Sequence, residues 1–177
     1  MILTGPQIEV ARRRGELAIE PFDPKRVSPN AYDFLLDPRI RVVHGDLDAK
    51  QPVATTDHVI PPQGVILQPG ALYLGLTLER TGSRKYAQHL FGDHSTGSLG
   101  IFVHVSAPLG HAGHDHCWTL EIRVVKPVIV YPGMIFGKLV FLDQLGDGGD
   151  YQAGVPKYTS DQIQNSQLYL EAATWTN

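Results

Sequence analysis

The sequence predicts a mainly β domain, either a sandwich or a jelly-roll barrel, preceded by one short N-terminal helix. Short apolar runs recur along the chain, and turn-forming residues separate them. The 18 glycines and 13 prolines suit a fold with many tight reversals. The 177 residues are enough for one domain with a proper core, and no repeat of fixed period divides them. We therefore expect a single domain over residues 1–177.

The N-terminal helix is predicted over residues 6–14. Thr4 suits the N-cap position, Gln7 stands where a capping box needs it, and Pro6 is tolerated in a first helical turn. Gly15 is a natural helix stop.

The remainder of the chain is predicted to be strands and loops. Strands are expected at residues 31–36, 40–43, 64–67, 72–78, 99–105, 119–125, 128–130 and 134–142. A polar loop is expected over residues 45–57, and a second loop, rich in small hydroxyl residues, over 92–98. The tail from residue 160 to 177 fits either a helix through 162–171 or an extended arm over a neighbouring subunit.

Composition excludes several classes of function. A net charge of −3 and a pI near 6.2 give no global basic field that would attract nucleic acid or an anionic membrane. The single cysteine, Cys117, excludes an internal disulfide framework and cysteine-rich metal sites. The N-terminus lacks a secretory signal, and no apolar run approaches the ~20 residues that cross a bilayer. We expect a cytoplasmic protein without nucleic-acid or membrane partners.

Residues 92–121 carry the candidate chemistry. A loop of small polar residues suits a polar ligand, and Glu121 follows in an otherwise hydrophobic strand. A carboxylate on such a strand is costly unless it is paired or used. Glu121 is therefore either a site residue or the partner of an arginine or lysine that holds the fold.

Four segments resemble the dCTP deaminase branch of the dUTPase-like superfamily. They read MILTGPQIEVARRRGELAIEPF, SPNAYDFLL, LQPGALYLGLTLE and PGMIFGKLVF, in the family's order. The resemblance implies a distorted β-barrel of the dUTPase type and a homotrimer with active sites between subunits. It implies that one subunit supplies a phosphate-binding loop and another a catalytic glutamate.

The family's glutamate stands in a Leu-Glu pair, which Leu120-Glu121 matches. The implied reaction is hydrolytic deamination of a deoxycytidine nucleotide, dCTP or a less phosphorylated analogue, at C4 of cytosine. One carboxyl group can activate water and then protonate the leaving ammonia, provided that burial raises its pKa toward neutrality. Mg²⁺ would accompany a triphosphate. No zinc is expected, because zinc deaminases need a Pro-Cys-x-x-Cys pair that a single cysteine cannot provide.

The phosphate loop departs from the family pattern. Asp93 and Ser98 replace two arginines, so triphosphate binding should be weakened. The resemblance places a C-terminal arm, about residues 157–177, over the nucleotide. The nucleotide-binding residues it implies are Ser95, Thr96, Ser98, Ala107, Lys157, Tyr158 and Gln162.

Two alternative functions stay open. A dUTPase-type diphosphohydrolase is weakened because His111 stands where an aspartate is expected. A catalytically degenerate trimer that binds nucleotides or serves as a structural protein would explain the lost arginines.

The turn that carries His111, His114 and His116 also has two interpretations. It could gather histidines from several subunits around a transition metal, or it could be a solvated polar turn. We expect the solvated turn, because the spacing matches no established zinc pattern.

Overall fold

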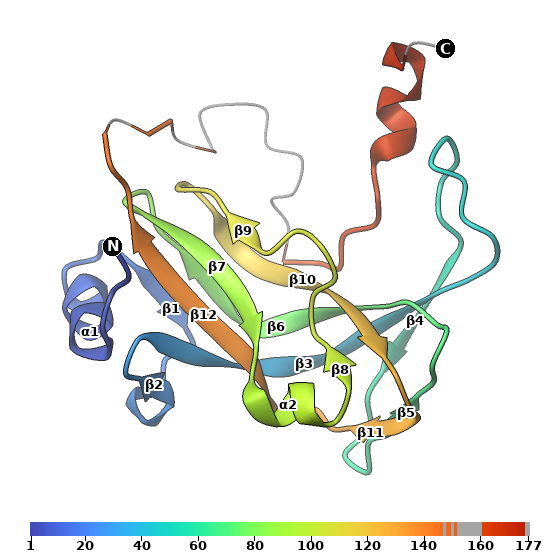
Figure 1. Ribbon diagram of the computed structural model, residues 1–177, viewed down its shortest axis with the longest axis horizontal. Coiled ribbons are helices and arrows are strands. Elements are labelled where there is room, and N and C mark those ends of the chain that lie inside the picture. The colour runs from blue at the N-terminus through green and yellow to red at the C-terminus, as the bar shows by residue number, and fades with distance from the viewer. Residues whose placement is uncertain (147, 150, 152–160, 176–177) are drawn as a thin grey trace.

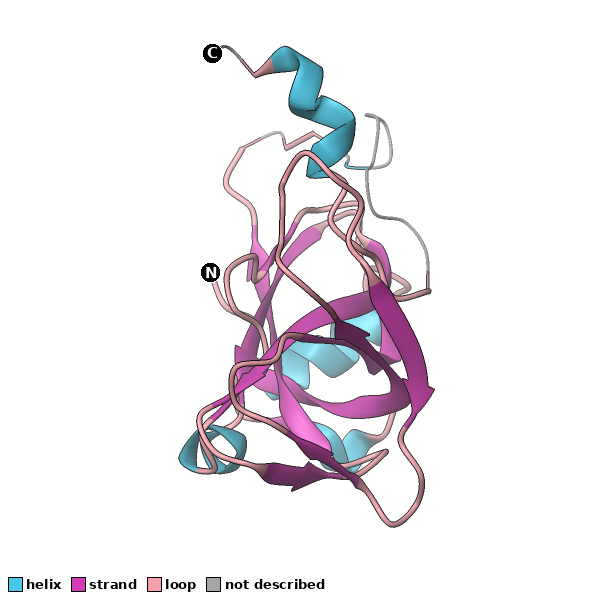
Figure 2. Cartoon of the chain, turned by 90° about the vertical axis from the view of Figure 1, so that its right-hand side faces the viewer, coloured by secondary structure: helices cyan, strands magenta, loops and turns pink. Residues whose placement is uncertain are grey.

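The computed structural model describes residues 1–146, 148–149, 151 and 161–175, and the fold is mainly β, as predicted. Within these residues an antiparallel sheet of ten strands curls into a half-barrel, with β11 and β5 paired separately (Figures 1 and 2). The backbone of the large sheet runs β8-β10-β6-β3-β12-β7-β9, and β1, β2 and β4 pair beside it. In the described part of the chain, no helix is long and apolar enough to cross a membrane.

The elements follow in chain order, with η marking 3-10 helices. They are α1 (Gly5–Arg13), β1 (Ala18–Glu20), η1 (Pro24–Arg26), β2 (Val27–Ser28), β3 (Ala31–Val43), β4 (Thr55–Val59), β5 (Val65–Leu67), β6 (Tyr73–Gly82), β7 (Tyr86–Gly92), α2 (His94–Ser98), β8 (Ile101–Phe102), β9 (Leu109–Gly110), β10 (Asp115–Val124), β11 (Val128–Val130), β12 (Ile135–Asp143) and η3 (Leu168–Thr174).

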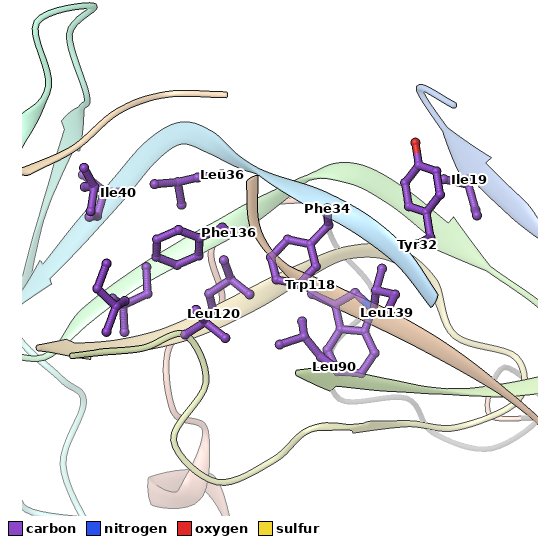
Figure 3. Close-up of a cluster of buried hydrophobic side chains, with 14 of the residues drawn as sticks. Ile19, Tyr32, Phe34, Leu36, Ile40, Leu90, Trp118, Leu120, Phe136 and Leu139 are labelled. Atoms are coloured by element: carbon purple, nitrogen blue, oxygen red, sulfur yellow. The ribbon is translucent and has the colours of Figure 1, made fainter. Parts of the chain in front are cut away.

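The hydrophobic core lies inside the curl of the sheet (Figure 3). Successive side chains of a strand point to opposite faces, so alternate residues of each strand reach the core. On β10 these are Trp118, Leu120 and Ile122, which pack with Phe34 of β3 and Phe136 of β12. Complete burial of such side chains stabilises a fold by about 1.5–3 kcal/mol each. Burial of these three side chains therefore directs the residues between them to the opposite face of β10.

Helix α1 confirms the prediction within one residue at each end. Ile8 and Ala11 face the core, and Gly15, with φ of 71°, ends the helix where the amide of Glu16 donates to the Ala11 carbonyl. Thr4 is the N-cap, but its side chain makes no capping hydrogen bond. The predicted capping box is therefore not formed.

Several predicted boundaries were wrong. The predicted strands 31–36 and 40–43 are one strand, β3, and β4 lies partly inside the predicted loop 45–57. β4 was missed because it is largely exposed on both faces, so it lacks apolar alternation, and its pairing with β3 is carried by the backbone. β7 was also missed. Polar Gln88 and His89 interrupt its apolar positions.

The predicted loop 92–98 contains the short helix α2, and the predicted strand 99–105 shrinks to the two residues of β8. Asp93 caps α2 by accepting a hydrogen bond of 2.9 Å from the Ser95 amide. Gly100 follows the helix with φ of 75°, where a Cβ would clash with Val125. A reversal of this kind takes up residues that an extended strand would need.

A buried ion pair ties η1 to the sheet. The Glu79 side chain on β6 is fully buried, and the Arg26 side chain, 11% exposed, donates to Glu79 Oε1. The other carboxylate oxygen, Oε2, accepts from the Leu35 amide at 3.0 Å. Arg26 also donates to the Asp33 carbonyl. Both oxygens of this buried carboxylate are thus satisfied, which a buried charge requires.

The expectation of a solvated histidine turn holds for His111, which is exposed, but is wrong for the other two histidines. His114 and His116 are only 6% and 7% exposed. Their ring centroids lie 3.8 Å apart, and the Trp118 ring lies 4.8 Å from that of His114. Burial lowers the pKa of His114 to about 3 and also lowers the pKa of His116. Among the described residues, no group of three or more histidine, cysteine, aspartate or glutamate side chains is arranged to hold a metal ion.

Replacement of Arg26 by methionine should lower the free energy of unfolding by about 3–5 kcal/mol, because it leaves the buried Glu79 charge unpaired. Urea denaturation measures the loss. Arg13→Met is the matched control, since Arg13 pairs with Glu9 at the surface of α1, and its cost should be about 0.3–0.5 kcal/mol. Equal losses in the two variants would contradict a structural role for the Arg26–Glu79 pair.

Acid should destabilise the fold through His114. The unfolded chain binds a proton at this histidine below pH of about 6.5, whereas the folded chain resists protonation until about pH 3. The contribution of neutral His114 to the free energy of unfolding is therefore fully present above pH 6.5. It is lost as the pH drops from 6.5 toward 3, by about 2 kcal/mol between pH 7 and pH 5. Urea midpoints at both pH values should show a smaller acid loss in His114→Phe than in the unmodified protein. His58→Phe, at an exposed position on β4, should leave the loss unchanged.

Candidate functional site

A cavity of about 970 Å³ lies beside β10, along the residues that face away from the core, and it also reaches the core residue Trp118. Thr119, Glu121 and Arg123 alternate with the core residues of this strand and line the cavity. Other lining residues come from residues 70–74, from most of residues 104–111, from the loop between β3 and β4, and from residues 164–166 and 168. In Figure 1 that loop and η3 stand on the same side of the molecule, and Leu47 and Leu168 from these two segments both line the cavity.

Glu121 is half-buried and faces this cavity. Its Oε2 accepts hydrogen bonds from the amide and the hydroxyl of Ser106, at 3.1 and 3.3 Å. Its Oε1 has no hydrogen-bond partner in the described part of the chain, and neither arginine nor lysine pairs with the carboxylate there. One oxygen is therefore held in place while the other is open to a ligand or to water. The alternative of a fold-holding ion pair does not apply to Glu121.

Histidines and Trp118 form one end of the cavity. His104, His114 and His116 all line it, and His104 meets the Trp118 ring edge-on with centroids 6.3 Å apart. His104 Nε2 and His116 Nδ1 are buried without a hydrogen-bond partner among the described residues. Aromatic rings and a few polar atoms are the usual lining of a small-molecule site.

Cys117, between His116 and Trp118 on β10, is buried and unreactive. Burial raises the pKa of its thiol to about 12, so the thiol stays protonated at neutral pH. A protonated thiol is a poor nucleophile and a poor metal ligand.

Of the residues predicted to bind nucleotide, Ala107 lies with Glu121 in the cavity wall, whereas Ser95, Thr96 and Ser98 do not line it. The Thr96 side chain is buried, and its hydroxyl lies 2.8 and 3.1 Å from the carbonyl oxygens of Asp93 and Phe136. The Ser98 hydroxyl donates to the His94 carbonyl at 2.9 Å, and Ser95 is exposed. Within a single chain, α2 and the cavity are separate.

Asp93, which replaces a family arginine, has a clear local role. Besides capping α2, it lies 3.2 Å from the Lys138 ammonium, which also pairs with Asp33 at 2.6 Å. Hydrogen bonds from the Ser95 amide and then from Lys138 lower the pKa of Asp93. The reversed charge is thus compensated within the protein.

The C-terminal arm packs against its own chain. The Cys117 amide donates to Asp161 Oδ1 at 2.8 Å, and the Gln164 amide donates to Thr119 Oγ1 at 3.1 Å. Arg41 donates to the Ile163 carbonyl at 3.1 Å. Residues 161–167 are therefore not part of the helix predicted over 162–171, and a 3-10 helix, η3, follows them. Residues 161–167 are extended, as the other prediction has it, and they contact β10 and β3 of their own chain.

Gln162 lies on this arm, beside a smaller pocket of about 190 Å³ formed with Arg39 and Arg41. Lys157 and Tyr158 lie outside the described residues. The sequence predictions missed two residues of the site: Arg123, which lines the cavity, and Ser106, which holds the Glu121 carboxylate. Arg123 could have been found, since strand alternation places it on the same face as Glu121. No local pattern distinguishes Ser106 as the donor to a carboxylate fifteen residues away.

Comparisons with known proteins identify the family of this chain. A model of the dCTP deaminase-like family matches residues 2–144. The chain is 40% identical over 168 residues to the "dCTP deaminase, dUMP-forming" of Clostridium acetobutylicum, covering 94% of this chain and 92% of the relative. It is 41% identical to the protein of the same name in Clostridium beijerinckii, over 97% of this chain and 98% of the relative.

A solved structure shares the fold. The 2'-deoxycytidine 5'-triphosphate deaminase of Agrobacterium tumefaciens superimposes with a TM-score of 0.63 at 21% identity. The match covers 79% of this chain and 47% of the solved chain, so the present chain matches about half the length of that protein. The family model and the two Clostridium relatives each span most of the sequence. The chain therefore belongs to the dCTP deaminase-like family.

Proposed function

We propose that this protein is an enzyme that hydrolytically deaminates dCTP, with Glu121 as general base and general acid. The observation that carries the proposal is the cavity in which Glu121 has one oxygen anchored by Ser106 and the other open. The names of the Clostridium relatives support dCTP as the substrate.

The proposed chemistry needs only one carboxyl group to move protons. Glu121 Oε1 accepts a proton from a water molecule as the water oxygen bonds to C4 of the cytosine ring. The same carboxyl group then gives a proton to the amino nitrogen, the C–N bond breaks and ammonia leaves. The sum is dCTP plus water to dUTP plus ammonia. Ser106 would keep the carboxylate aimed during both transfers, which is how a positioned group lowers a barrier.

We propose dUMP as the final product, since the relatives are named dUMP-forming. Formation of dUMP needs a second water, whose oxygen bonds to the α-phosphorus as diphosphate leaves. Mass spectrometry of the nucleotides after incubation with dCTP separates dUMP with diphosphate from dUTP alone.

We propose that the active enzyme is a homotrimer. Ser95, Thr96 and Ser98 do not line the cavity of their own chain, which supports a site where this loop meets a neighbour's Glu121. Ala107 would contact the nucleotide, and Lys157, Tyr158 and Gln162 would do so from the arm. Mg²⁺ would enter as the counter-ion of the triphosphate substrate. A cytoplasmic location is supported by the single cysteine.

Glu121→Gln should abolish deamination, with kcat reduced by at least about 100-fold, because the amide cannot take up and return a proton. Ammonia release from dCTP measures the rate. Glu9→Gln, on the exposed side of α1, is the matched control and should be unchanged. Near-normal ammonia release from Glu121→Gln would remove Glu121 from the mechanism. If the unmodified protein leaves dCTP intact, the proposed function fails.

Ser98→Arg should tighten dCTP binding by about 10- to 100-fold, because it restores a charge-assisted contact to phosphate. This change keeps the Asp93 cap and the Asp93–Lys138 pair, which Asp93→Arg would destroy. The KM for dCTP and direct calorimetry measure the change. Gln63→Arg, in an exposed turn, adds the same charge and should have no effect. Equal affinities of Ser98→Arg and the unmodified protein would show that α2 is not a phosphate site.

A further inference from the structure

We propose that Arg123 is the residue that binds the phosphate groups of the nucleotide in the cavity. Among the described residues that line this cavity, Arg123 is the one arginine, and no lysine is present. The inference rests on the proposed function for the nucleotide itself, but the assignment of an anion site to Arg123 rests on the cavity.

The strand places Arg123 in register with Glu121. The two residues are two positions apart on β10, so their side chains leave the same face, with Cα atoms about 6.6–6.8 Å apart. Glu121 pairs with Leu74 of β6, whereas Arg123 pairs with Phe102 of β8, further along β10. A nucleotide whose base lies at Glu121 can therefore direct its phosphates along the strand to a guanidinium group.

Arg123 is free to bind an anion. It makes no hydrogen bond or ion pair with any described residue, and its side chain belongs to an exposed strand position. Four arginines on or beside the strands of the sheet are committed to carboxylates instead. Arg26 pairs with Glu79, Arg39 with Asp37, Arg41 with Asp57 and Arg80 with Asp115. An unpaired guanidinium beside a cavity is the group that grips phosphate with two parallel hydrogen bonds.

The proposed phosphate loop has no unpaired cationic group of its own. The loop that the family uses for phosphate carries Asp93 and Ser98 in place of arginines. The lysine beside that loop, Lys138, is neutralised by Asp33 and Asp93. A triphosphate is highly anionic and needs cationic partners that are not already paired. Arg123 supplies such a partner from the same strand as the catalytic carboxylate.

Calorimetric titration with inorganic tripolyphosphate tests the anion site without any nucleoside. Arg123→Gln should weaken binding by about 10- to 100-fold, because it removes charge-assisted contacts. Arg123→Lys should retain part of the affinity, since it keeps the charge but loses the fork. Arg14→Gln, an exposed arginine at the end of α1, removes the same charge far from the cavity lining and should bind normally.

Steady-state kinetics with dCTP give the second readout. Arg123→Gln should raise the KM much more than it lowers kcat, and binding of deoxycytidine, which has no phosphate, should be unchanged. The inference is overturned if Arg123→Gln binds tripolyphosphate normally, if the unmodified protein does not bind it, if Arg14→Gln is equally weakened, or if deoxycytidine binding falls in parallel. Loss of tripolyphosphate binding in Arg123→Gln, in a protein that does not convert dCTP, would refute the proposed function and support the anion site.

Discussion

The two faces of β10 are the constraint on which the candidate site depends. Trp118, Leu120 and Ile122 are locked into the core, so the residues between them must face the other way. Because protein cores are packed without appreciable voids, the strand cannot slip by a residue without exposing these side chains and burying the charged ones. The position of Glu121 is thus set by hydrophobic burial, and Ser106 adds only the final orientation.

The tripeptide Thr-Leu-Glu occurs twice, and its two glutamates have opposite environments. Glu79 is buried on β6, where Arg26 and the Leu35 amide satisfy both oxygens of its carboxylate. Glu121 lies at the rim of a cavity, where only one of its oxygens is bound to the protein. A fully paired carboxylate is committed to the fold, whereas a half-paired one can exchange protons with a ligand. The same tripeptide therefore has a structural role at Glu79 and a candidate chemical role at Glu121 because the surrounding residues differ.

Charge has been redistributed around the proposed nucleotide site. Asp93 is a good helix cap and a good partner for Lys138, but it cannot attract phosphate. The neighbouring histidines add little positive charge, because burial keeps His114 and His116 neutral near pH 7. We propose that Arg123, which lines the cavity, supplies the cationic group that the family's loop would provide.

The sequence by itself determined the β class, the position of α1 and the strand that begins within PGMIFGKLVF, and it singled out Glu121 as the candidate site residue. These depend on local periodicity, on helix-stop chemistry and on motifs that survive in order. Only the tertiary structure decided that β4 and β7 are strands, that residues 94–98 turn into a helix and that His114 and His116 are buried. It alone brought Ser106 within hydrogen-bond distance of Glu121. Backbone pairing, burial and ion pairing between distant segments leave no periodic trace in a sequence, because they depend on which neighbours the fold supplies.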